Sequence, residues 1–455
     1  MSDPIPDIAK VAAEDNASNR RRGKRIPDWR RSPLGPIVTR IAENLSDQAS
    51  VLPLLLVVAF GLRAVWIDLP QHSLIFDETY YVNAARIILG LPVAHGAPYA
   101  GSPVGLDPNT EHPPLGKLLI ALSMVLFGDN GLGWRFPSIV AGMTALGALY
   151  LIVRAAGETA WFGILAVALF AFDNLAFVHG RIGTLDMLVL APILLAAWLA
   201  LRERWALAGL LLAVGILMKL TAIYGLLALL ILLAIRIISI WWRERRIVLG
   251  EVRPAVTLVA VFAVVALGGL GLLDARFSSY KNPLDHLSHM ISYGADLKAP
   301  VDHTGICATT DSAPWQWPFN ECQINYLRVD VTVRAGDKVI SNTPSIDFRG
   351  ALDPLLAGAI PLATLFAVWL AWRARNRLAL WAIVWAAANY LPYVALAMIS
   401  DRITYIYYFL PVIPAVAIAI ALLLLRSGLP RFVLWGYLAA YLVGFAAYFP
   451  FRRIP

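Results

Sequence analysis

The sequence predicts an all-α protein that crosses a membrane many times. Hydrophobic residues make up 59% of its 455 residues, charged residues make up only 15%, and the mean hydropathy is +0.66. Soluble globular proteins are nearer about a quarter charged, so this composition excludes an ordinary soluble class. Apolar stretches long enough to cross a bilayer recur along the chain, and basic residues gather in every second connection between them. These observations together predict a polytopic membrane protein.

Residues 1–50 are expected to form a basic cytoplasmic tail. Eight basic residues gather within segment 20–40: Arg20, Arg21, Arg22, Lys24, Arg25, Arg30, Arg31 and Arg40. A basic segment beside the first span sets topology and contacts anionic lipid, which is favoured over a tail that binds a partner. No apolar core directly follows the basic run, so a cleavable signal peptide is not expected. The formal net charge of +8 is concentrated rather than spread over a face, so no nucleic-acid partner is predicted.

About eleven segments come near the length of about 20 apolar residues that a span needs. They are 51–68, 134–155, 159–178, 184–202, 205–219, 221–240, 254–273, 351–372, 379–399, 403–425 and 430–449, of which the fifth is short. If the N-terminus is cytoplasmic, the inner connections carry Arg154, Arg202, Arg204, Arg236, Arg246, Arg373, Arg375, Arg377, Arg426 and Arg431. This pattern follows the positive-inside rule. The exception is the C-terminal pair Arg452 and Arg453, which this count places outside.

The topology divides the chain after the tail into three parts. Residues 51–273 form an N-terminal catalytic transmembrane module that includes the outer loop 69–133. Residues 274–350 form a second long extracytoplasmic loop, and residues 351–455 form the C-terminal transmembrane helices. The apolar segment 115–127 is too short to span and is expected to lie as a helix in the outer interface.

The same topology gathers ionisable side chains at the outer face. They are Asp77, Glu78, Asp107, Glu111, His112, Lys117, His179, Arg181, Asp186, Lys219, Asp274, Asp401 and Arg402. A channel filter would more often show rings of like charge, and a coupled transporter would place its carboxylates near the midplane. An aspartate at the lipid boundary can act as a general base, and cations beside it can hold a phosphate. The residues therefore predict group transfer from a lipid-linked phosphate.

Four segments resemble the protein O-mannosyltransferase family, a branch of the membrane-embedded GT-C glycosyltransferases that use polyprenyl-phosphate sugars. They are "FDETYY" (76–81), "EHPPLGKLLIA" (111–121), "FGDNGLGWRFPS" (127–138) and "GRIGTLD" (180–186). The resemblance implies a GT-C fold, a lipid bilayer environment and transfer of mannose to Ser or Thr of exported proteins. Thr79 and Tyr80 after the acidic pair are nearer the pattern of the lipid A aminoarabinose transferases, which show some likeness. Loop 274–350 is too short for the large luminal module of eukaryotic members, so a prokaryotic plasma membrane with an extracytoplasmic site is expected.

The resemblance places the catalytic acid of the family at Asp77. We expect Asp77 to be the general base of an inverting transfer. Glu78 is expected either to orient Asp77 or contact the acceptor, or to cap the following helix. Contacts to the donor phosphate or sugar are expected from His112, Lys117, Arg135, Arg181, Lys219 and Arg402. The alternatives are a snorkelling Lys117, an interfacial anchor at Arg135 and a local ion pair of Arg402 with Asp401.

Cys307 and Cys322 fall in the second outer loop, where an oxidising compartment favours a disulfide between them. His286 and His289 in "DHLSHM" lack an identifiable third ligand, so a solvated helix is the favoured interpretation and no metal residue is assigned. No cofactor is predicted, although a divalent metal is left open.

Two other functions remain open from the sequence. The same chemistry could act on a lipid or envelope glycan acceptor instead of a polypeptide. A protein of a different class, a transporter or flippase of lipid-linked sugar, would also place charges near one membrane face.

Overall fold

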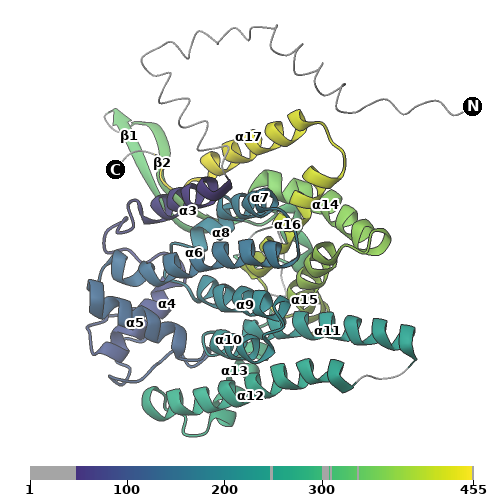
Figure 1. Cartoon of the computed structure of the whole chain (residues 1–455). Coiled ribbons are helices and arrows are strands. Elements are labelled where there is room, and N and C mark those ends of the chain that lie inside the picture. The colour runs from purple at the N-terminus through teal and green to yellow at the C-terminus, as the bar shows by residue number, and fades with distance from the viewer. Residues whose placement is uncertain (1–47, 246–248, 300–306, 308–309, 336–337, 453–455) are drawn as a thin grey trace, which may run out of the picture. The chain divides into compact units, whose positions relative to one another are not determined.

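A computed structural model of the chain describes residues 48–245, 249–299, 307, 310–335 and 338–452 (Figure 1). The chain divides into two units, residues 1–54 and residues 55–455. The described part of the first unit is the beginning of helix α3 (Gln48–Ala64). The basic run of the expected tail lies outside the described residues, and everything below concerns residues 55–455.

The described chain is built mainly of α-helices. After α3 the first half contains α4 (Glu78–Leu89), α5 (Leu115–Phe127), α6 (Gly131–Ala155), α7 (Ala160–Ala171), α8 (Asn174–His179), α9 (Leu185–Leu201), α10 (Trp205–Ile216), η2 (Leu220–Ala222) and α11 (Ile223–Glu244). The second half contains α12 (Leu249–Phe277), α13 (Pro283–Asp296), η3 (Pro314–Phe319), β1 (Ile324–Ala335), β2 (Lys338–Gly350), α14 (Pro354–Arg373), α15 (Arg377–Ser400), η4 (Ile406–Val412), α16 (Ile413–Arg426) and α17 (Arg431–Tyr448).

Seven helical segments of the described residues are long and apolar enough to cross a membrane. They are Gly131–Ala155, Leu220–Glu244, Gly250–Phe277, Pro354–Arg373, Arg377–Ser400, Ile406–Arg426 and Arg431–Tyr448. The chain is therefore an integral membrane protein, but the expected count of eleven spans is not confirmed. Four expected spans, 51–68, 159–178, 184–202 and 205–219, correspond to apolar helices of fewer than 18 residues. In segment 159–178, for example, Asp173 ends α7 and caps α8 by accepting a hydrogen bond from the Ala176 N–H at 3.0 Å.

The helices differ in how much of their apolar surface is buried in the protein. Of the most apolar 18-residue stretch of each, 83% is buried for the segment that contains α16, but only 17% for the segments of α12 and α17. Helix α16 packs against α7, α14 and α15, and α9 packs against α6 and α10. α16 therefore belongs to the protein core, whereas most side chains of α12 and α17 are partly buried or exposed.

The second outer loop contains a β-hairpin that the sequence interpretation did not predict (Figure 1). β1 and β2 pair antiparallel from Ile324 opposite Gly350 to Ala335 opposite Lys338, with three shifts of register. The inner end of β2 is held by the C-terminal segment, because the Asp347 N–H donates to the Pro450 carbonyl at 2.8 Å. In this loop Cys307 and Cys322 form a disulfide, and Cys322 is buried just before β1.

Candidate active site

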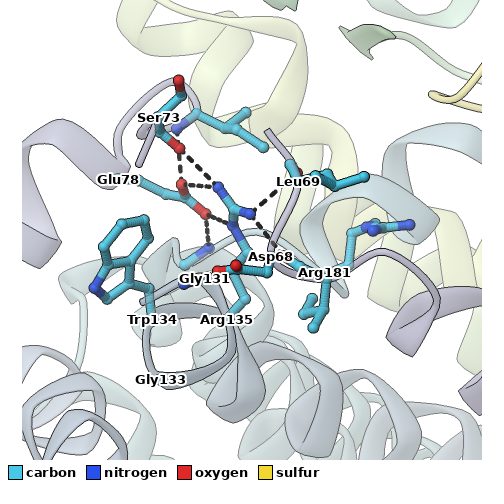
Figure 2. A network of polar contacts seen from close by, with 12 residues as sticks. Asp68, Leu69, Ser73, Glu78, Gly131, Gly133, Trp134, Arg135 and Arg181 are labelled. Atoms are coloured by element: carbon cyan, nitrogen blue, oxygen red, sulfur yellow. Dashed lines mark hydrogen bonds and ion pairs between the residues drawn. The ribbon is translucent and has the colours of Figure 1, made fainter. Parts of the chain in front are cut away.

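The two carboxylates of the "FDETYY" motif have different surroundings. Glu78 opens α4 and is fully buried. Its Oε1 accepts from Arg135 Nε at 2.8 Å and from the Gly183 N–H at 2.7 Å. Its Oε2 accepts from Arg135 Nη2 at 2.9 Å and from the Ile75 N–H at 2.7 Å. Both oxygens of Glu78 are therefore occupied by the protein itself, and Glu78 acts as an anchor for the segment around Asp77 (Figure 2).

All five N–H donors of the Arg135 guanidinium form hydrogen bonds with Glu78 and nearby backbone carbonyls. Besides the two bonds to Glu78, Nη1 donates to the carbonyls of Ile67 and Leu69 at 2.7 and 3.2 Å, and Nη2 donates to the Ser73 carbonyl at 2.9 Å. An arginine has five N–H donors, and these contacts account for five. No donor is left for a phosphate, so the geometry assigns Arg135 to holding the loop before Asp77 and not to binding the donor.

Asp77 stands at the N-terminal boundary of α4 with its side chain uncommitted. Its carboxylate caps nothing and makes no hydrogen bond or ion pair with any residue that the structure describes. Burial raises the pKa of Asp77 to about 7, Lys219 acts in the opposite direction, and Asp186 raises the pKa further. Near neutral pH such a carboxylate can both take up and release a proton, as a general base must.

The backbone before Asp77 is strained and is held by aromatic rings. Phe76 has φ of 55°, a left-handed conformation that bulky side chains rarely adopt. Its ring stacks on Tyr326 of β1 with centroids 4.1 Å apart and meets Tyr407 edge-on at 5.5 Å. Strained residues of this kind persist only where the surrounding structure fixes them. The hairpin thus helps to fix the position from which Asp77 projects.

Lys219 is presented by the break between α10 and α11. It has an extended backbone there, and its Nζ donates to Asp186 Oδ1 at 2.7 Å. Burial lowers the pKa of Lys219, but Asp186, Tyr408 and Asp77 together outweigh burial and hold this pKa above its ordinary value. The Nζ also lies 5.5 Å from the centre of the Tyr407 ring and 5.9 Å from that of Tyr408. Lys219 is therefore a buried cation next to Asp77.

Lys117 supports the segment that carries His112. Its Nζ is fully buried, pairs with Asp107 at 2.7 Å and donates to the carbonyls of Asn109 and His112 at 2.5 and 2.6 Å. This geometry favours a structural role over the expected contact to a donor, and it differs from snorkelling because the ammonium does not reach the surface.

The histidines of "DHLSHM" support the same segment from α13. His286 Nδ1 lies 2.7 Å from Asp274 Oδ1, and its Nε2 donates to the Thr110 carbonyl at 3.0 Å. His289 Nε2 lies 3.2 Å from Thr110 Oγ1. The described residues contain no group of three or more His, Cys, Asp or Glu side chains that could hold a metal ion.

His112 lies on this supported segment. Its imidazole forms a hydrogen bond with the backbone of Glu111 and rests against Tyr81, with ring centres 5.9 Å apart. Burial, together with the charges of Lys219, Lys117 and Arg402, lowers the pKa of His112 well below its ordinary value. His112 is therefore neutral, and the ring nitrogen that does not meet the Glu111 backbone can form a hydrogen bond with a ligand.

Arg402 has a buried donor that no described residue fills. Its Nη1 is buried without a hydrogen-bond partner in the described ranges. The guanidinium lies against Gly294 of α13, where an added side-chain carbon would come within 3.4 Å of Nη1. It makes no ion pair with Asp401 among the described residues, so the local pair considered from the sequence is not observed. An unfilled guanidinium N–H beside His112 is suited to a phosphate oxygen.

The guanidinium of Arg181 forms its hydrogen bonds with backbone carbonyls at the end of α3. Its Nη1 donates to the Leu62 carbonyl at 3.3 Å, and its Nη2 donates to the carbonyls of Val65 and Trp66 at 2.9 and 3.3 Å. It therefore caps the C-terminal end of α3, a favourable place for a cation. Figure 2 shows that its side chain points away from the Glu78–Arg135 pair. A phosphate contact from Arg181 is not supported by this placement.

Two residues of the site received no role from the sequence. Asp186 lies within the quoted "GRIGTLD", so its signal was present, but its pairing with Lys219 joins positions that are distant in sequence. Tyr326 gave no signal beyond its place in the outer loop. Its hydroxyl lies 2.9 Å from His179 Nε2, and the other ring nitrogen of His179 lies 3.1 Å from Thr184 Oγ1. Tyr326 thus ties the hairpin to the C-terminal end of α8.

The fold that positions these residues is the GT-C fold of membrane-embedded glycosyltransferases. The structure aligns with the protein O-mannosyltransferase Pmt1-Pmt2 complex of S. cerevisiae, solved bound to the sugar donor, with a TM-score of 0.65 and 11% identity. The alignment covers 89% of this chain and 90% of that one. It also aligns with ArnT from Cupriavidus metallidurans, with a TM-score of 0.54, 21% identity, and coverage of 85% of this chain and 62% of that one.

The sequence comparisons point in the same direction. A family model described as dolichyl-phosphate-mannose-protein mannosyltransferase matches residues 111–267. The polyprenol-phosphate-mannose–protein mannosyltransferase of Mycobacterium tuberculosis is 35% identical over 112 residues, which are 25% of this chain and 20% of that protein. The chain thus matches about a fifth of the length of this relative. The resemblance to the protein O-mannosyltransferases and the GT-C fold are confirmed.

Proposed function

We propose that this protein transfers a mannosyl residue from a polyprenyl-phosphate donor to a Ser or Thr hydroxyl of an exported polypeptide, with inversion at the anomeric carbon. The observation that carries the proposal is the uncommitted carboxylate of Asp77 beside the Lys219–Asp186 pair. The mycobacterial relative is a polyprenol-phosphate-mannose–protein mannosyltransferase, and this activity, together with the fold shared with the yeast enzyme, supports the choice of donor and acceptor.

In the proposed step Asp77 accepts the proton of the acceptor hydroxyl while its oxygen bonds to the anomeric carbon. The bond from that carbon to the phosphate oxygen breaks through an oxocarbenium-like state. The bond electrons leave with the polyprenyl phosphate. A buried cation and an unfilled guanidinium donor stabilise charge that develops on a leaving oxygen. Lys219 and Arg402 supply these groups, and the neutral His112 adds a hydrogen bond.

We place the reaction on the extracytoplasmic side of a prokaryotic plasma membrane. The site is built from the segments between spans that the positive-inside pattern assigns to the outer side. A donor with its phosphate at headgroup level and its chain in the bilayer would reach this site from the membrane.

The test is transfer by the purified full chain. It should be incubated with radiolabelled polyprenyl-phosphate mannose and, separately, with a Ser/Thr peptide, a glycolipid or an envelope glycan. We expect label on the peptide and, by NMR of the product, the anomeric configuration opposite to that of the donor. Label on the glycolipid or glycan alone would show that the acceptor is not a polypeptide. A product with the same anomeric configuration as the donor would exclude direct inversion. Movement of donor across liposomes without any transfer would favour the flippase.

A further inference from the structure

A cavity lies at the opposite ends of the helices that carry the candidate site. It has a volume of about 360 Å³ and is lined by the end of α9, the second half of α11 and the start of α15. α9 begins beside Asp186 and ends at Leu201, and α15 begins at Arg377 and ends just before Arg402. Since α9 has 17 residues that each rise about 1.5 Å, about 25 Å separates this cavity from the site. The cavity is therefore separate from the candidate active site.

Most of the polar groups of this cavity satisfy one another. Glu203 accepts from Arg236 Nη1 at 2.6 Å and from the Trp205 indole N–H at 2.9 Å. Arg236 Nε pairs with Glu251 at 2.8 Å, and the Ser239 hydroxyl donates to the Arg236 carbonyl at 2.7 Å. The acidic side chain of the lining is thus already neutralised and hydrogen-bonded.

Two lining groups remain without partners, and both are donors. The side chain of Trp381 is 2% exposed, and its Nε1 has no hydrogen-bond partner in the part of the chain that the structure describes. Arg377 is exposed and forms no ion pair with any described residue. A buried donor without an acceptor costs about 1–3 kcal/mol, so an occupant that supplies acceptors is favoured. An anion is favoured further by Arg377.

The rest of the lining is apolar, with Ala197, Leu229, Leu233 and Leu380 among its members. α11 and α15 both belong to segments that are long and apolar enough to cross a membrane. An occupant must therefore combine an anionic head, rich in hydrogen-bond acceptors, with an apolar chain. A small soluble anion would not make apolar contacts with the leucine side chains.

We propose that this cavity binds an anionic glycerophospholipid from the leaflet opposite the active site. Its phosphate lies at Arg377, a phosphate or ester oxygen accepts from Trp381 Nε1, and part of one acyl chain lies along the leucines of α11. This lipid is a bound component of the protein and not its substrate, so the inference does not depend on the proposed transferase activity.

The test is native mass spectrometry of the full chain in detergent, titrated with phosphatidylglycerol, phosphatidylcholine or a polyprenyl phosphate. We expect phosphatidylglycerol to bind more tightly than phosphatidylcholine. Arg377→Gln should weaken phosphatidylglycerol binding by about tenfold or more, as expected for loss of a charge-assisted hydrogen bond. Arg375→Gln is the matched control, because Arg375 is an exposed arginine two positions earlier that does not line the cavity.

Trp381→Phe provides a second variant that keeps an aromatic ring next to Trp385, whose ring centre lies 5.0 Å away. It removes only the donor and should weaken phosphatidylglycerol binding several-fold, with an unfolding temperature near that of the wild type. Equal binding by the Arg377 and Arg375 variants, or no preference for phosphatidylglycerol, would overturn the proposal. Tighter binding of polyprenyl phosphate with the same dependence on Arg377 would overturn the choice of occupant.

Discussion

Glu78 and Arg135 form a buried two-point ion pair, with Nε–Oε1 and Nη2–Oε2 distances of 2.8 and 2.9 Å. This pair fixes the segment from which the neighbouring Asp77 projects, while the Asp77 carboxylate itself stays uncommitted. The acidic pair of the motif therefore divides into an anchor, Glu78, and the proposed base, Asp77, and each residue has its own experimental signature.

Arg135→Lys should unfold at a markedly lower temperature than the wild type. A lysine cannot reproduce the fork that meets both oxygens of Glu78 and three carbonyls, so a buried carboxylate would be left poorly paired. Breaking a buried ion pair costs roughly 3–5 kcal/mol. Arg86→Ala is the control, because its pair with Asp129 is partly exposed and worth about 1 kcal/mol or less. Equal shifts for both variants in detergent would contradict the anchor role.

The transfer reaction should lose activity as the pH falls through about 7, the value to which burial raises the pKa of Asp77. Protonated Asp77 cannot accept a proton, so kcat/KM should fall about tenfold per pH unit below that value. Asp186 raises the pKa of Asp77, so Asp186→Asn should move this acidic limb to lower pH. The measurement is the pH profile of kcat/KM for both forms. Asp330→Asn in the hairpin should leave the limb in place, and an unmoved limb in Asp186→Asn would count against the electrostatic coupling.

Arg402→Gln should raise the KM for the donor by about tenfold or more, because the side chain would lose its charge-assisted hydrogen bond to the phosphate. Lys298→Gln is a matched control. Lys298 pairs with Arg402 in a β-bridge, and its Nζ donates to the Ser400 carbonyl at 2.7 Å on the protein surface. The donor KM of each variant is obtained from initial rates measured over a range of donor concentrations, and only Arg402→Gln should show an increase. A donor KM that stays at the wild-type value in Arg402→Gln would remove Arg402 from the phosphate site.

Tyr326→Phe should lower kcat by roughly 2–10-fold, because loss of one neutral hydrogen bond is worth about 0.5–1.5 kcal/mol. Tyr326→Ala should lower it further, because it also removes the ring on which Phe76 stacks. Tyr448→Phe removes a hydroxyl bonded to Gln323 at 3.1 Å, beside the same strand but away from Asp77. Steady-state rates for the three variants test the order. If Tyr326→Ala and Tyr448→Phe retained equal kcat, Tyr326 would not position the site.

The parts of the site that sequence could predict are those with local signals. Asp77 was predicted from its motif and from its place beside a span. The strand β1 also had a local signal in the alternation of Val329, Val331 and Val333, which has the period of a strand. This alternation lies in loop 274–350, for which the sequence analysis predicts no strand.

The roles of the cations could not be predicted in this way. Arg135, Arg181 and Arg402 have the same side chain, and they differ only in how many carbonyl oxygens the fold brings within reach. For Arg181 those carbonyls come from residues more than a hundred positions earlier, at the end of α3. Composition and spacing contain no such information. The expected count of eleven spans is also not confirmed, and one local reason is that Asp173 interrupts an apolar segment with a helix cap.

The central claim is that Asp77 is the base that receives the acceptor proton. Asp77→Asn keeps the size of the side chain and removes its basicity. Single-turnover transfer and donor binding should therefore be measured on the same preparation of this variant. We predict that transfer falls by roughly 10²–10⁴-fold while the Kd of the polyprenyl-phosphate mannose donor stays near the wild-type value. Transfer at the wild-type rate by Asp77→Asn would contradict the account.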